Sequence, residues 1–212
     1  MIRIIDGRSK HNHLTDIAAM HKIRKKIFHD RKKWEVPVIN DWEIDGYDAL
    51  SPLYLLYINQ DKMVAGGLRL LPTTGFTMIN DTFPFLLPDS KRIESPLIWE
   101  SSRFAVDHCA DAVAGKKGIS RATAELGLAM NEIGMRTGLS HIVTVYDALM
   151  HRILQRAGCA GEPISPPQMV GRVMTYAVFF DVSMETETAL RAASGIQGSV
   201  LEENAAKIDR AA

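Results

Sequence analysis

The sequence predicts an α/β protein in which helices cover both faces of a mixed sheet. Paired strand-like segments come early in the chain, whereas helix-like and strand-like segments alternate in its second half. No repeat, low-complexity block or Pro/Gly/Ser-rich linker divides the 212 residues, so we expect a single domain over residues 1–212. A chain of this length can bury most of the surface that its unfolded form exposes.

The first half of the chain contains one predicted helix and three predicted strands. Residues 2–5 predict a short strand, and apolar residues at helical spacing over 14–28 predict an amphipathic helix. The polar, acidic and aromatic stretch 29–52 is too long for an ordinary connection, and loops of this length are often functional. Residues 53–59 and 63–71 predict two paired strands.

The second half predicts three more strands and two helices. Strands are expected over 97–106, 141–146 and 172–182, and a helix over 119–135. Asp147 is a suitable N-cap for a further helix, which would end before Gly158. The tail 183–212 is polar, rich in Ala and Glu, and of uncertain order.

Charge and hydropathy exclude several classes of protein. Lys+Arg and Asp+Glu each number 25, so no net charge favours nucleic acid or stable membrane association. No apolar stretch is long enough to span a bilayer, and the N-terminus lacks a secretory signal. The two cysteines, Cys109 and Cys159, form no metal-binding pattern. We therefore expect no metal site and a reducing, cytoplasmic location.

Cationic, aromatic and acidic residues gather around the end of the first helix and the long loop. Arg24 and Phe28 are four residues apart and so share a helix face. Aromatic rings attract a sulfonium or ammonium by roughly 0.5–2 kcal/mol, and arginine binds carboxylates with two parallel hydrogen bonds. The set suits a ligand with a cation and a carboxylate; alternatively, the rings anchor the helix and the charges form surface pairs. Its members are Arg24, Phe28, Trp34, Trp42, Asp45 and Asp48.

The strand 97–106 contains charged residues that a structural strand would not choose. In a regular strand, Glu100 and Ser102 point to one face and Ser101 and Arg103 to the other. An unpaired carboxylate in an apolar strand has a raised pKa, which makes glutamate a usable general base near neutral pH. An ion pair of Glu100 with Arg69 or Arg103 explains the same residues equally well.

A basic turn flanked by glycines, residues 114–121, precedes the helix 119–135. Its cations, Lys116, Lys117 and Arg121, oppose the dipole of that helix. An anion on the exposed backbone N–H groups, such as the phosphate of a pantetheine arm, would turn this cost into a gain. A solvated basic turn is the alternative, since the glycine pattern is weak.

Together, these segments resemble the LuxI-type autoinducer synthases, which are acyl-homoserine-lactone synthases. The run Arg24-x3-Phe28-x5-Trp34-x10-Asp45-x2-Asp48 matches the N-terminal signature of that family in identity and spacing. Later matching positions are Arg69, Phe83, Glu100, Arg103 and Phe104.

The resemblance implies a fold similar to the CoA-dependent N-acetyltransferases, with a mostly antiparallel, twisted sheet split by a cleft. It implies that the α-amine of S-adenosylmethionine attacks an acyl thioester on acyl carrier protein or CoA. The homoserine carboxylate would then displace methylthioadenosine and close the lactone, a quorum-sensing signal. S-adenosylmethionine and the acyl thioester are both substrates, so no cofactor is expected.

The resemblance also implies roles for individual residues. Glu100 is the expected base, Phe28 and Trp34 the wall beside the sulfonium, and Asp45 the partner of the amino group. Arg103 or Arg24 would meet the carboxylate, with Asp48 and Arg69 behind them. Further substrate-binding candidates are Trp42, Phe83, Ser102, Phe104, Lys116, Lys117, Arg121 and Thr144, the last linked in the family to 3-oxo chains. Thr144 could equally be a strand residue that faces its neighbour.

The acyl chain requires an apolar pocket, and the tetrahedral oxyanion requires donors, expected among backbone N–H groups near Glu100. Pocket candidates are Met78, Leu126, Met130, Val143, Tyr146, Leu149, Ile153 and Phe179, most of which would be core residues in any α/β fold. Two other functions remain open. A CoA-dependent N-acetyltransferase with another acceptor would not need the aromatic and acidic loop, and a non-catalytic sensor would not need Glu100 as a base.

Overall fold

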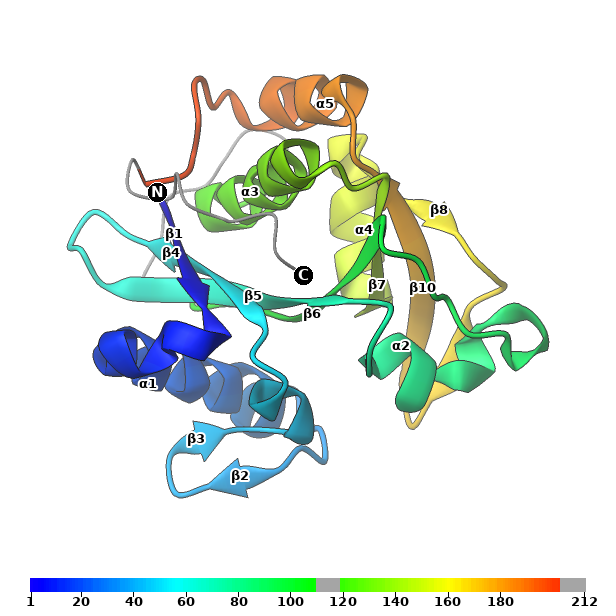
Figure 1. Ribbon diagram of the computed structural model, residues 1–212, viewed down its shortest axis with the longest axis horizontal. Helices are drawn as coiled ribbons and strands as arrows, with labels where there is room; N and C mark the ends of the chain where they lie inside the picture. The colour runs from blue at the N-terminus through cyan, green and yellow to red at the C-terminus, as the bar shows by residue number, and fades with distance from the viewer. Residues whose placement is uncertain (110–118, 203–212) are drawn as a thin grey trace.

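The computed structural model describes residues 1–109 and 119–202, and it confirms a mixed α/β fold. Within these residues, an eight-stranded sheet has the order β1-β4-β5-β6-β7-β10-β8, with β9 beside β10 (Figure 1). Among the strands that the structure describes, β6 and β7 form the one parallel pair, so the sheet is mostly antiparallel, as expected. The strands are β1 (Ile2–Asp6), β4 (Leu53–Ile58), β5 (Val64–Pro72), β6 (Ile98–Val106), β7 (His141–Asp147), β8 (Glu162–Pro163), β9 (Gln168–Val170) and β10 (Val173–Asp181).

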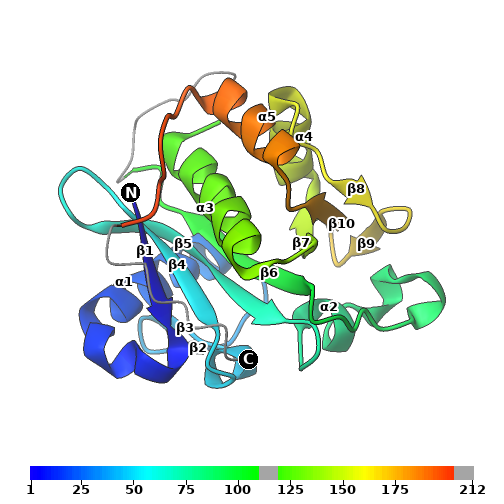
Figure 2. The ribbon, with the colours of Figure 1, turned by 45° about the horizontal axis from the view of Figure 1, so that its top comes forward.

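Helices cover both faces of this sheet (Figures 1 and 2). On one face, α1 (Leu14–Arg24) packs against β5 and β6. On the other, α3 (Arg121–Thr137) packs against β4 and β5, and α5 (Met184–Ser194) lies on α3. Near the far end of the sheet, α2 (Met78–Asp81) contacts β6 and β7, and α4 (Ala148–Ala157) contacts β7 and β10.

Local sequence signals place the ends of α4 as predicted. The Asp147 side chain accepts a hydrogen bond from the backbone N–H of Met150 at 2.9 Å, which satisfies a donor at the helix start. The helix ends before Gly158, whose φ of 74° suits a residue without a Cβ.

The predicted loop 29–52 has more structure than its composition indicated. The first helix continues as a π-helical turn, η2 (Lys25–Arg31), which is followed by a hairpin of β2 (Val38–Ile39) and β3 (Trp42–Glu43). A 3₁₀ turn, η3 (Gly46–Ala49), is capped by Asp45. In the described part of the tail, α5 is followed by a parallel bridge from Leu201 to Ile2. Short 3₁₀ turns absent from our prediction are η1 (Gly7–His13), η4 (Pro84–Leu86) and η5 (Pro88–Ser90).

The sheet splits between β6 and β7. Their pairing runs from Ile98 opposite His141 to Ser101 opposite Thr144, whereas β6 continues to Val106 and β7 to Asp147. The two strands therefore separate in the middle of the sheet, which agrees with the split sheet that the resemblance implied.

Candidate active site

A buried network of three arginines and three carboxylates lies between α1, the long loop and the sheet. Its members are Arg24, Arg69, Arg103, Glu43, Asp45 and Asp48. Buried charges are stable only when they are paired and hydrogen-bonded, and each member of this network is.

Arg24 forms the innermost part of the network. Its Nη1 and Nη2 atoms donate to the two oxygens of Asp48, both at 2.9 Å, and its Nε donates to Glu43 Oε2 at 2.5 Å. Only 1% of Arg24 is exposed. Burial alone would raise the pKa of Asp48, but the hydrogen bonds and charge of Arg24 lower it well below its usual range. Arg24 therefore lies behind the exposed part of the network together with Asp48, rather than at the position where a substrate carboxylate could reach it.

Arg69 joins this inner part to the surface of the network. It is fully buried, donates to Asp45 through Nη1 at 2.5 Å, and reaches Ser102 Oγ through Nε at 3.1 Å. Asp45 also accepts from Arg103 Nη2 at 2.9 Å. With side-chain exposures of 9% for Asp45 and 11% for Arg103, these two are the members of the network closest to solvent.

Arg103 faces the network because β6 contains a β-bulge. Gly67 pairs with Ala105 and Arg69 with Ser102, so Arg103 and Phe104 together oppose the single residue Leu68. Arg103 has a φ of 57°, an uncommon left-handed conformation for a side chain of this size. The predicted alternation is thus wrong at this residue, since Arg103 lies on the same face as Ser102 rather than opposite it. Phe104 instead packs against the core beside α3.

Glu100 lies beside the network on the same face of β6. It is 1% exposed and accepts hydrogen bonds from the backbone N–H groups of Met78 at 2.9 Å and Ile79 at 2.5 Å. Burial raises the pKa of Glu100 to about 7, against the opposing effects of those two N–H groups and of the charges of Arg69 and Arg103. Among the described residues, Glu100 forms no direct ion pair with either arginine, so the structural ion-pair interpretation is wrong.

Of four aromatic candidates, Phe28 borders the network and Trp34 stacks on Phe28, whereas Trp42 and Phe83 lie elsewhere. Phe28 and Trp34 are stacked with ring centroids 5.4 Å apart, and the Arg103 guanidinium lies 5.7 Å from the Phe28 ring. Trp42 is 40% exposed and packs near His21, on the outside of the β2–β3 hairpin. Phe83 lies in the apolar cluster beneath α2, near Val143.

The remaining predicted site residues are spread over the fold. Thr144 donates its hydroxyl to the carbonyl oxygen of Ser101 at 2.8 Å, at the point where β6 and β7 separate. Arg121 begins α3 and binds Glu125 at 2.7 Å. Lys116 and Lys117 lie outside the described residues.

The acyl-pocket candidates fall into separate groups. Val143 and Phe179 lie under α2 with Met78 near Glu100, whereas Leu126 and Met130 belong to the core under α3. Tyr146 stacks with His151 and Tyr176, Ile153 packs beside α3 and α5, and Leu149 is 49% exposed. These residues do not form one continuous wall.

Glu43 is a member of the network that sequence reasoning missed. It is fully buried and holds both Arg24 and Arg103, through Oε2 and Oε1 respectively. Its signal was the spacing to Asp45, because residues two apart in an extended segment face the same side. The His21 ring donates from Nδ1 to the Glu43 carbonyl at 2.8 Å and holds the hairpin in place.

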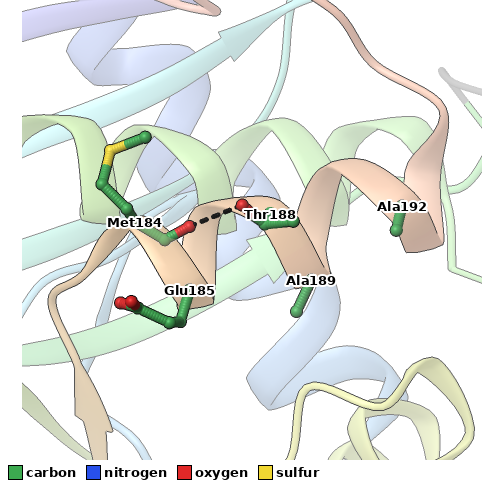
Figure 3. A pocket seen from close by; sticks show the side chains of 5 residues that line it. All are labelled: Met184, Glu185, Thr188, Ala189 and Ala192. Carbon is green, nitrogen blue, oxygen red and sulfur yellow. Dashed lines mark hydrogen bonds between the residues drawn. The ribbon is translucent and has the colours of Figure 1, made fainter.

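Other features of the described residues offer no competing site. A surface hollow on α5 is lined by Met184, Glu185, Thr188, Ala189 and Ala192, on the far side of α3 from the network (Figures 1 and 3). No three His, Cys, Asp or Glu side chains in the described ranges are grouped as a metal site requires. None of the described helices has the length and apolar character needed to cross a bilayer.

The mostly antiparallel sheet that splits between β6 and β7 places the chain in a fold class that includes N-acetyltransferases. A putative N-acetyltransferase from Lactobacillus plantarum shares the fold, with a TM-score of 0.54 and 14% identity over 86% of this chain and 99% of that one. The chain belongs to the autoinducer synthase family, whose profile matches residues 9–190.

Individual members of this family are similar over most of their length. The acyl-homoserine-lactone synthase of Pseudomonas aeruginosa is 37% identical over 177 residues, which cover 82% of this chain and 86% of the relative. BjaI, a CoA-dependent acyl-homoserine lactone synthase solved with S-adenosylmethionine and isopentyl-CoA, superimposes with a TM-score of 0.81. It is 26% identical, and the match covers 95% of this chain and 92% of BjaI. The activity of the chain is accordingly acyl-homoserine-lactone synthesis, the N-acylation of S-adenosylmethionine followed by lactonisation.

Proposed function

We propose that Glu100 is the general base that removes a proton from the α-amine of S-adenosylmethionine. The observation that carries this proposal is the position of Glu100, buried on β6 beside the arginine–carboxylate network with a pKa raised to about 7. A base with a pKa near the working pH combines a useful ionised fraction with a strong tendency to accept a proton.

The network supplies the site for the amino-acid part of the substrate. Asp45 and Arg103 are its least buried members, so Asp45 receives the substrate amino group and Arg103 the carboxylate. Phe28, next to Arg103, presents its ring to the sulfonium. Arg24, Glu43, Asp48 and Arg69 position these groups from behind, because their polar atoms are occupied by one another.

The acyl thioester lies where β6 and β7 separate. Beyond Ser101 and Thr144, the facing edges of the two strands no longer pair with each other, so backbone N–H groups there can bind the developing oxyanion. The donor is a pantetheine thioester, carried by CoA or by acyl carrier protein. A cytoplasmic location supplies both substrates, and the reaction needs no further cofactor.

The chemistry then follows in two balanced steps. The amine nitrogen bonds to the thioester carbonyl carbon, the thiolate leaves, and the proton passes through Glu100 to the departing sulfur. The carboxylate oxygen next attacks the methylene carbon bonded to the sulfonium sulfur. That carbon–sulfur bond breaks, methylthioadenosine leaves, and the lactone closes.

Product mass spectrometry tests this function. The protein would be incubated with S-adenosylmethionine and a panel of acyl-CoAs and acyl carrier proteins, alongside the Glu100→Gln variant. We expect acyl-homoserine lactone and methylthioadenosine in equal amounts, and a kcat for Glu100→Gln lowered by about 10²–10⁴-fold with little change in substrate affinity. An unchanged kcat would refute the role of Glu100. Thioester consumption without methylthioadenosine would instead indicate an N-acetyltransferase with another acceptor.

A further inference from the structure

The π-helical turn η2 contacts both strands that border the split in the sheet. On one side, Lys26 Nζ binds Asp107 Oδ2 at 2.7 Å, one residue beyond the end of β6. On the other, Lys32 directly follows η2 and forms an ion pair with Asp147, the last residue of β7. One short segment is therefore fastened to the two strands after they have separated.

The contacts made by η2 are of a kind that can open and close. The side chain of Lys26 is 50% exposed and that of Lys32 28% exposed, and ion pairs with exposed partners contribute little to stability. π-Helical turns are rare and occur mostly at functional sites. Phe28 lies in η2 between Lys26 and Lys32, beside Arg103 and stacked on Trp34.

We infer that η2 is a strap across the opening between β6 and β7, and that the Lys32–Asp147 ion pair must break before the acyl thioester can enter. This inference rests on the proposed position of the donor between these strands. We assign this role to the Lys32–Asp147 pair rather than to the Lys26–Asp107 pair, because Lys32 is less exposed than Lys26 and connects η2 to the strand on the far side of the opening.

One substitution should remove the Lys32–Asp147 ion pair and leave the other contacts of Asp147 in place. Asp147 binds Lys32 through Oδ2 and caps α4 through Oδ1. Asp147→Asn keeps an oxygen for the cap, since asparagine is as good an N-cap as aspartate, but loses the charge. Lys32→Gln removes the same pair from the other side. Lys25→Gln is the matched control, because Lys25 pairs with Asp30 within the same segment and does not cross the opening.

Steady-state kinetics with an acyl-CoA as the variable substrate provide the first test. For Asp147→Asn and for Lys32→Gln we expect kcat/KM for the acyl donor to rise about two- to five-fold, mainly through KM. The double variant should rise no further than Lys32→Gln alone, because Asp147→Asn breaks an ion pair that Lys32→Gln also breaks. Lys32→Gln additionally removes the contact of Lys32 Nζ with the Trp34 ring, 4.5 Å from its centroid. Lys25→Gln should match the unmodified protein. Donor KM values that do not change, or that rise in both variants, would overturn the inference.

Hydrogen exchange provides a readout that does not depend on turnover. Backbone amides of residues 25–32 should exchange faster in Asp147→Asn than in Lys25→Gln, and faster in the unmodified protein once butyryl-CoA is added. Equal exchange in all these samples would also overturn the strap. If the role proposed for Glu100 were wrong, the kcat of Glu100→Gln would equal that of the unmodified protein, which is a distinct result.

Discussion

The carboxylate of Glu43 accepts a hydrogen bond from Nε of Arg103 at 3.0 Å, although Arg103 lies 60 residues further along the chain. The other oxygen of the same carboxylate binds Arg24, so Glu43 connects the buried end of the network to its solvent-facing end. The orientation of Arg103 therefore depends on a residue of the β2–β3 hairpin, which lies outside the main sheet.

Glu43→Gln should destabilise the protein strongly. The substitution leaves two buried guanidinium groups with one carboxylate fewer, and breaking a buried ion pair in this way costs about 3–5 kcal/mol. Asp16→Asn is the control, because Asp16 pairs with Arg3 near the surface and should cost less than about 1 kcal/mol. Urea unfolding of the three proteins measures the difference, and equal midpoints would contradict a supporting role for Glu43.

The pH dependence of turnover should reflect Glu100. A general base must be ionised, and the pKa of Glu100 is raised to about 7, so kcat should fall by roughly tenfold per pH unit as the pH drops below 7. The residual activity of Glu100→Gln should lack this acidic limb. A profile for the unmodified protein that stays flat down to pH 5 would assign the proton to another group.

The contribution of Glu100 to the free energy of unfolding should fall as the pH rises. An ion-paired carboxylate with a lowered pKa would show the opposite dependence. The folded protein holds the proton of Glu100 more tightly than the unfolded chain, whose glutamate pKa is 4.5. Stability is therefore lost as the pH rises from about 4.5 through 7, by an amount on the order of 3 kcal/mol. In denaturant unfolding, the free energy of unfolding of Glu100→Gln should increase relative to that of the unmodified protein between pH 5 and pH 8. A constant difference between the two would show that Glu100 is ionised throughout.

Phe28→Leu should weaken the binding of S-adenosylmethionine and leave the acyl donor unaffected. Loss of the ring removes a cation–π contact, so KM for S-adenosylmethionine should rise roughly 2- to 30-fold. Trp42→Ala should leave this KM unchanged, because Trp42 lies on the outer side of its hairpin. The opposite pattern, with Trp42 sensitive and Phe28 not, would move the sulfonium site to the hairpin.

Much of the fold follows from patterns that are local in sequence. The period of apolar residues, the Asp147 cap and the terminal Gly158 are each set by neighbouring residues, and the structure confirms all three. The tail and the long loop were harder to predict, because α5 and the β2–β3 hairpin are stabilised by packing on distant segments.

The candidate site could be predicted in composition but not in arrangement. Glu100 was identified because a carboxylate in an apolar strand breaks a local rule. The direction of Arg103 depends on one extra residue in β6, and no signal within that strand distinguishes a bulge from regular alternation. The burial of Arg24 likewise depends on Glu43, which only the folded hairpin brings beneath it.

The equal numbers of arginines and carboxylates in the network have a consequence for electroneutrality during the reaction. The six side chains sum formally to zero, so the ionised Glu100 carries the only unbalanced charge of the group. S-adenosylmethionine with a protonated amine carries a net charge of +1 and restores neutrality when it binds. Lactone, methylthioadenosine and the free thiol are all uncharged. Of the two protons that the substrate ammonium loses, one goes to the thiolate and the other remains on Glu100, so that proton must pass to solvent before Glu100 can balance the charge of the next S-adenosylmethionine.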